Sequence, residues 1–187
     1  RSAGMWTVAL ICSGNALDIR AIGGKIAEVL VQRGLVVNLL DVFTLDVMTL
    51  SELQISDDSG SMRKFGKNAI TALASIEAAK ALPLHRWLFA LGIPGIGATV
   101  AEQVAQLHSD FADLASLAIA GRTADFYDAV ERASSLNPKA AANRGLDGDK
   151  RDELTERFLR CCGEIGVLGD ELVAKGAARK VPGTQLP

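Results

Sequence analysis

The chain has 187 residues, a formal net charge of −2 and a hydrophobic content of 49%, but only 5% of its residues are aromatic. This length suits one large domain or two small ones, and the abundance of Ala and Leu favours helices over a β-sandwich. Residues 1–108 carry nine basic and nine acidic side chains, and residues 109–187 carry eleven and thirteen. Neither half is a polycation, which excludes strong DNA binding by bulk charge alone.

The three cysteines are Cys12, Cys161 and Cys162, and no Cys-x-x-Cys pair occurs. This pattern predicts a reduced, cytoplasmic chain without a disulfide framework and without a zinc site. The apolar segment at residues 5–11 is too short to span a bilayer and lacks the architecture of a signal peptide, so we expect no membrane contact. Arg1 at the start predicts a fragment of a longer protein.

Apolar spacing along the chain predicts helices throughout and essentially no sheet, because no segment sustains a period-2 alternation. The helices are expected over residues 2–13, 15–19, 26–33, 39–45, 50–55, 68–80, 84–91, 98–107, 110–117 and 150–175. Asp41 and Thr49 are capping candidates, and Pro83 suits the first turn of the helix that follows it. Loops are expected at residues 56–60, 120–123 and 134–145, and a frayed tail at 179–187.

Three segments share one plan, in which a glycine-containing turn joins two apolar helices. The turns lie at residues 21–24, 64–67 and 93–97, a spacing of about 30–40 residues that is typical of stacked helical units. The third turn is the most complete, because Gly92, Gly95 and Gly97 tolerate positive φ and Pro94 fixes its own φ. Backbone N–H groups at the start of the next helix would then face an anion, most naturally a phosphate.

With these turns placed, residues 10–117 resemble the helix-hairpin-helix domain of bacterial NAD⁺-dependent DNA ligase. The resemblance begins at Asn15-Ala-Leu-Asp-Ile19 and continues through Val31-Gln-Arg-Gly-Leu35, Asp41–Leu45 and Phe65–Lys80. It is strongest at Leu82-Pro-Leu-His-Arg-Trp-Leu-Phe-Ala-Leu-Gly-Ile93. It implies an all-α fold of tandem helix-hairpin-helix units, similar to SAM-like and RuvA domain 2-like folds, with an additional helical arm.

The resemblance also implies a function. The parent enzyme would seal nicks in DNA replication and repair with NAD⁺, Mg²⁺ and Zn²⁺, whereas this fragment would hold no cofactor and would not be catalytic alone. Its partners would be nicked duplex DNA, gripped without base readout, and the other domains of the parent in the bacterial cytoplasm and nucleoid. The DNA-binding residues implied are Gly23, Gly24, Lys25, Phe65, Gly66, Lys67, Asn68, Arg86, Gly92, Ile93, Pro94, Gly95, Ile96, Gly97, Ala98 and Thr99.

Several features depart from the family pattern. The adenylation motif Lys-x-Asp-Gly is absent, because Gly145 stands where Leu146-Asp147-Gly148 would need the lysine, and the four-cysteine zinc module is absent as well. Ala21 replaces the usual first glycine of the first turn. A fourth hairpin is not visible. We therefore expect a DNA-binding domain over residues 1–117 and a helical insertion or arm of unassigned role over 118–187.

Two other functions stay open. The chain is either a helix-hairpin-helix module of another DNA repair protein, or an α-helical protein-interaction domain without DNA binding. The near-neutral charge and the acidic-basic arm favour the second of these. Apolar surface left exposed by missing domains would drive dimers.

Overall fold

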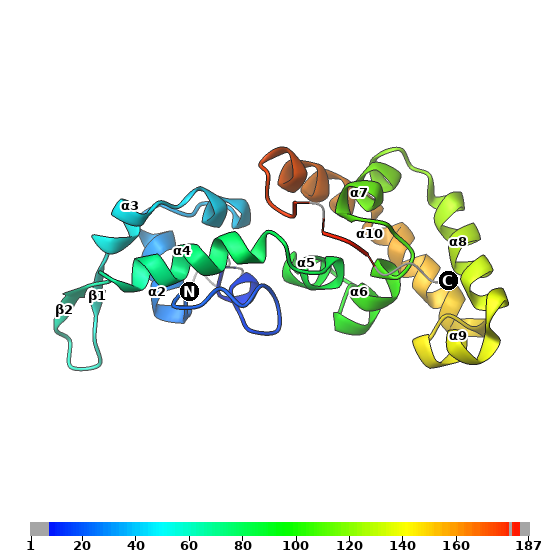
Figure 1. The fold of residues 1–187 in the computed structure, drawn as a ribbon, viewed down its shortest axis with the longest axis horizontal. Helices are drawn as coiled ribbons and strands as arrows, with labels where there is room; N and C mark the ends of the chain where they lie inside the picture. The colour runs from blue at the N-terminus through cyan, green and yellow to red at the C-terminus, as the bar shows by residue number, and fades with distance from the viewer. Residues whose placement is uncertain (1–7, 180, 184–187) are drawn as a thin grey trace. The chain divides into compact units, whose positions relative to one another are not determined.

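The structure, a computed structural model, describes residues 8–179 and 181–183. The chain forms two compact units, Arg1–Lys80 and Ala81–Pro187 (Figure 1). The boundary between these compact units, after Lys80, differs from the functional boundary that the sequence predicts at residue 117. The second unit combines the third glycine turn with the whole C-terminal arm.

The first unit packs its short elements around a core of aliphatic side chains and alanines. After a helical stretch at residues 8–11, its elements are α2 (Gly24–Gln32), η1 (Leu39–Thr44), α3 (Val47–Ser51), β1 (Gln54–Ser56), β2 (Met62–Lys64) and α4 (Asn68–Ala79). Helix α2 ends because Gly34 adopts a φ of +67° and the Leu35 amide bonds back to the Leu30 carbonyl at 3.0 Å. The predicted stop at Gly34 is therefore confirmed.

Two helix predictions for the first unit are wrong. No helix forms over residues 15–19, because residues 14–17 are turns and Asp18 then adopts a φ of +49°. Residues 54–56 form a strand, not a helix, and pair antiparallel with 62–64 in the register Ile55 to Arg63. The expectation of essentially no sheet holds among the described residues apart from this hairpin, whose strands of three residues are too short to show a period-2 pattern.

Side-chain caps fix the short helices of this unit. Asn38 and Asp41 form a reciprocal capping box at the start of η1. Asp46, not Thr49, caps α3, and its carboxylate accepts a hydrogen bond from the Thr49 amide at 2.8 Å. Both candidates from the sequence therefore take part in caps, Thr49 as the donor.

The second unit is a helical array built on one long helix. Its elements are α5 (Leu84–Ala90), α6 (Ala98–Ala105), α7 (Phe111–Ile119), α8 (Thr123–Leu136), α9 (Pro138–Arg144) and α10 (Gly148–Ala174). Helix α10 packs against α7, α8 and α6 (Figure 1). Of the predicted tail, residues 181–183 are fixed by a bridge between Pro182 and Asp110 and by the bond from the Gly183 amide to the Ser109 carbonyl.

The loop predicted over residues 134–145 is instead the end of α8 and all of α9. Asn137 caps the second helix by accepting from the Ala140 amide at 3.2 Å, and Pro138 occupies its first turn. These are favourable helix-start residues, and the alanines that follow are strong helix formers. The Asn and Lys residues of this segment are also typical of loops, so composition alone predicts a loop here.

Helix α10 is continuous, although Gly163, Gly166 and Gly169 interrupt its apolar pattern. Two of these glycines lie where α7 comes closest. A Cβ on Gly166 would lie 3.0 Å from the Ile119 amide nitrogen, and one on Gly169 would lie 2.8 Å from the Ala115 Cβ. Gly163 has open space around it. The first two glycines therefore permit close helix packing rather than breaking the helix.

A histidine lies inside the aromatic cluster of the second unit. His108 is only 4% exposed, and its ring stacks with Phe126 and Phe158 at centroid distances of 6.0 and 6.4 Å. Its Nδ1 lies 3.1 Å from the Asp113 carboxylate, and among the described residues nothing pairs with its buried Nε2. Burial lowers the pKa of His108 below its ordinary value of 6.5, although the neighbouring Asp113 opposes this.

Acidification should therefore destabilise the second unit. Because its pKa is lower in the folded chain, His108 binds protons more tightly when unfolded, so its stabilising contribution is present above pH 6.5 and is lost as the pH falls toward the folded pKa. We expect a lower free energy of unfolding in urea at about pH 5 than at about pH 7.5. The difference should shrink in His108→Gln and persist in His85→Gln. An equal pH dependence in both variants would contradict this role.

Candidate nucleic-acid interface

The turn between α5 and α6 is held by alternating glycines and buried isoleucines. Gly92 and Gly95 adopt φ values of +62° and +84°, which side chains disfavour. Ile93 and Ile96 are 3% and 4% exposed, so they anchor the turn in the core. The backbone thereby reverses within a few residues and leaves Gly97 exposed at the start of α6.

The start of α6 presents backbone amides to solvent. Gly97 is the N-cap residue and offers no side-chain cap, while its carbonyl accepts from the Ala101 amide at 2.9 Å. Ala98 and Thr99 are exposed, and their amides precede the first intrahelical donor. Within the described residues, no protein group accepts from these two amides. The positive end of the helix dipole adds to an arrangement that suits an anion.

Helix α10 supports this turn from the protein side. The Cys161 Sγ donates to the Pro94 carbonyl at 2.8 Å, and a Cβ on Gly95 would lie 3.8 Å from the same sulfur. Burial raises the pKa of the Cys161 thiol, which keeps it protonated as the donor. The cysteine pattern in the sequence predicts only the absence of a disulfide framework and a zinc site, and it gives no signal for this hydrogen bond.

The first glycine turn reproduces the third one residue by residue. Asp18 and Ala21 have φ values of +49° and +68°, at the positions of Gly92 and Gly95. Ile19 and Ile22, like their counterparts, are buried at 2% and 4% exposure. Gly23 caps α2 with φ −92° and ψ −174°, against −83° and −177° at Gly97. The two turns therefore share one backbone conformation.

The hydrogen bonds at the start of α2 follow the same scheme as those at the start of α6. The Gly23 carbonyl accepts from the Ala27 amide at 2.9 Å, and no side chain caps α2. Gly24 and Lys25 thus take the places of Ala98 and Thr99, and no described protein group accepts from their amides. Ala21 adopts the left-handed conformation at an energetic cost of about 1 kcal/mol. The substitution of the usual glycine changes the strain but not the backbone path.

The sequence carries a signal for this repeat that the glycine pattern alone does not show. Residues 16–24 read Ala-Leu-Asp-Ile-Arg-Ala-Ile-Gly-Gly, and residues 90–98 read Ala-Leu-Gly-Ile-Pro-Gly-Ile-Gly-Ala. The shared Ala-Leu-x-Ile-x-x-Ile-Gly places both buried isoleucines and the N-cap glycine. Asp18 and Ala21 obscure the match, because in a sequence it is glycine that indicates a position with positive φ.

The second turn, at Phe65–Asn68, is built differently. It follows strand β2 rather than a helix, so the predicted helix–turn–helix plan is wrong for this segment. The Phe65 and Gly66 amides donate to the carbonyls of Leu53 and Ser51, and the Asn68 amide donates to the Phe65 carbonyl. Lys67 caps α4 in a helical conformation. This turn therefore presents fewer free amides than the other two.

Basic side chains accompany the first two turns more than the third. Lys25 forms an ion pair with Asp58, and the Lys64 ammonium lies 2.6 Å from the Glu52 carboxylate. Lys67, in the second turn, is exposed. In the second unit, Arg86 is half-buried in the first turn of α5. The segment Gly92–Thr99 itself contains no cationic side chain, so any anion held there would depend on backbone amides.

No group of three His, Cys, Asp or Glu side chains within the described part of the chain is arranged to hold a metal ion. Among the helices of residues 8–179, none combines the length and the apolarity that a membrane span requires. The described part of the chain is mainly helical, and its first and third glycine turns have the same backbone conformation.

Proteins named DNA ligase are similar to most of this chain. The DNA ligase of Akkermansia muciniphila is 33% identical over 172 residues, which is 90% of this chain and 22% of that protein. The DNA ligase of Synechococcus sp. strain CC9605 is 33% identical over 71% of the chain and 18% of its own length. That of Halorhodospira halophila is 40% identical over 50% of the chain and 12% of its own length.

These similarities relate the chain to a segment of DNA ligases. The chain spans less than a quarter of the length of each of these relatives. No protein-family profile matches it. The match to the Akkermansia protein covers 90% of the chain and therefore extends well into the arm predicted at residues 118–187.

Proposed function

We propose that this chain is the helix-hairpin-helix domain of an NAD⁺-dependent DNA ligase and that it binds nicked duplex DNA without sequence specificity. The observation that carries the proposal is the repeated turn. Residues 18–25 and 92–99 share their positive φ positions, their buried isoleucines and their exposed N-terminal amides. Two such turns would each hold one phosphate of the DNA backbone.

The chemistry of these turns suits phosphates and not base edges. Peptide N–H groups at a helix N-terminus are donors for an anion, and they distinguish no base from another. The net charge of −2 means that bulk attraction contributes little, so binding should be weak and should depend on the few phosphates contacted. Lys25, Lys67 and Arg86 would add side-chain contacts beside the turns.

The arm fits this proposal as a support. We propose DNA contact over residues 1–117 and a structural role for α8–α10, because α10 donates the Cys161 hydrogen bond to the third turn. Nick sealing would then need other domains of the parent protein, and we place NAD⁺, Mg²⁺ and Zn²⁺ with those domains. We propose no chemical step for the described residues themselves.

A salt titration tests this proposal. The full chain is titrated against a fluorescent nicked duplex of two unrelated sequences, at several salt concentrations from about 20 to 200 mM. We expect equal affinities for the two sequences and a slope of log K against log salt of about −2 or steeper, since at least two phosphates are contacted. A sequence preference of tenfold or more would favour another kind of DNA-binding module. Absence of binding at the lowest salt would favour the protein-interaction domain.

A further inference from the structure

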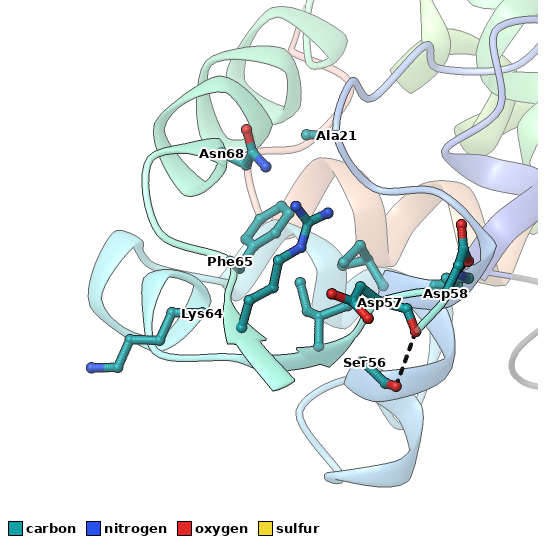
Figure 2. Close-up of a pocket in the computed structure, with 11 residues that line it drawn as sticks. Ala21, Ser56, Asp57, Asp58, Lys64, Phe65 and Asn68 are labelled. Carbon is teal, nitrogen blue, oxygen red and sulfur yellow. Dashed lines mark hydrogen bonds and ion pairs between the residues drawn. The ribbon is translucent and has the colours of Figure 1, made fainter. Parts of the chain in front are cut away.

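A hollow of about 440 Å³ lies in the first unit, beside the first glycine turn. Its lining includes the cations Lys25 and Arg63, the side chains of Phe65 and Asn68, and the carboxylates of Asp57 and Asp58. Figure 2 shows Asn68 and Phe65 on one side of it and Asp57 and Asp58 on the other, with Lys64 directed away. Cationic, amide and acidic groups from α2, β2, α4 and the β1–β2 loop thus meet at one place.

The two acidic residues of the loop have different roles. The Asp57 carboxylate accepts from the amides of Ser59 and Ser61, both at 2.9 Å, and from the Ser59 hydroxyl at 2.6 Å. It therefore shapes the tip of the hairpin. Asp58 takes no part in these hydrogen bonds of the turn, and its carboxylate instead pairs with the Lys25 ammonium.

Asp58 lies where two cations act on one carboxylate. Its pKa is lowered first by the hydrogen bond and charge of Lys25 and further by the charge of Arg63. Its side chain is nevertheless 96% exposed, and that of Lys25 is 63% exposed. Solvent screens such a pair, so another anion can replace the carboxylate at little cost. A phosphate offers a negative charge and more acceptor oxygens, and Lys25 and Arg63 both line the hollow in which it would lie.

We propose that this hollow binds a phosphate group of a nucleic-acid strand through Lys25 and Arg63, and that the Asp58 carboxylate occupies the position of that phosphate in the free protein. The inference rests on the proposed function for its ligand. It adds a side-chain phosphate site beside the amides of Gly24 and Lys25, and it makes the β1–β2 loop a competitor of DNA. Binding would break the Lys25–Asp58 pair.

The test compares Asp58→Asn with a matched loss of negative charge. Glu77→Gln is the control, because Glu77 is an exposed carboxylate of the same unit, paired with Lys80 at 2.9 Å. It lies nine residues along α4 from Asn68, which is about 13 Å by the rise of the helix. We expect Asp58→Asn to bind duplex DNA about threefold more tightly than the wild-type chain, with a salt slope steeper by about one unit. Glu77→Gln should change both much less.

A second pair of variants tests the cation. In the Asp58→Asn background, Arg63→Gln should remove the gain in affinity, whereas Arg33→Gln, at the exposed end of α2, should leave most of it. Duplexes with a 5′-phosphate or a 5′-hydroxyl at the nick separate the two sources of the ligand. Equal binding identifies an internal phosphodiester, and a preference for the phosphorylated nick identifies the terminal phosphate.

Titration with inorganic phosphate alone, without DNA, tests the hollow independently of the proposed function. The amide NMR signals of Lys25, Arg63 and Asn68 should shift together, and more in Asp58→Asn than in the wild-type chain. If the chain fails to bind duplex DNA but these shifts occur, the phosphate site in the hollow is supported and the proposed function is contradicted. If the duplex binds but Asp58→Asn matches Glu77→Gln and phosphate shifts none of these amides, the inference falls alone.

Discussion

Gly97→Asp should weaken duplex binding by about tenfold at low salt, because it removes one phosphate contact and adds a negative charge at the same place. The variant should fold normally. Gly97 has a φ of −83° and open space at its Cβ, so an aspartate fits without strain. Aspartate is also a better N-cap than glycine by a few tenths of a kcal/mol, because its carboxylate accepts from the first-turn amides. The amides of α6 would then be occupied by protein instead of DNA.

The matched control is Gly163→Asp in the same unit. Gly163 is exposed on α10 and also has open space at its Cβ, so the same charge is added outside the turn and without occupying the amides of α6. Gly23→Asp makes the equivalent change in the first turn. Each variant at a turn should lower the magnitude of the salt slope by about one unit, and the double variant should lower it by about two. Equal binding by Gly97→Asp and Gly163→Asp, with both folded, would remove the third turn from the interface.

Gly169→Ala should lower the free energy of unfolding by about 2 kcal/mol, whereas Gly163→Ala should raise it by up to about 1 kcal/mol. Both changes improve helix propensity equally. They differ only in the space available to the added methyl group. A Cβ on Gly169 would lie 2.8 Å from the Ala115 Cβ and 3.1 Å from the Phe111 ring, while a Cβ on Gly163 would have nothing within 4 Å. The methyl group at position 169 would push α10 away from α7.

Urea denaturation followed by circular dichroism measures both values. The comparison also reports on the third turn, because the same helix donates the Cys161 hydrogen bond to Pro94. If Gly169→Ala proved as stabilising as Gly163→Ala, the close packing of α10 on α7 would be wrong.

The sequence predicts best those elements whose boundaries are set by local residues. Helices α4, α5 and α6 begin and end within about two residues of the expected positions, because Gly66, Pro83 and Gly97 mark their starts. Helix α9 was missed, since the side-chain oxygen of Asn137 caps it by accepting from the Ala140 amide, which composition alone does not reveal. The β-hairpin was missed because only Ile55 in its two strands is buried, which leaves too little pattern to detect.

The candidate site divides in the same way. Glycines mark the third turn in the sequence, and the structure gives it the positive φ values and the exposed amides that these residues permit. The equivalence of the first turn depends on Asp18 and Ala21 adopting a conformation that neither favours, which only the surrounding core can enforce. The hollow beside it depends on the hairpin tip reaching α2, a tertiary contact between residues that lie 33 positions apart. DNA contact by all of these residues stays a prediction.

The most direct test that both helix starts bind DNA phosphates is an amide NMR titration of the full chain with a nicked duplex. We expect the amide signals of Gly24, Lys25, Ala98 and Thr99 to shift together over the same range of DNA concentration. Gly97→Asp should remove the shifts of Ala98 and Thr99. Shifts that spare both helix starts while the duplex binds elsewhere, on α8 or the exposed face of α10, would contradict this expectation.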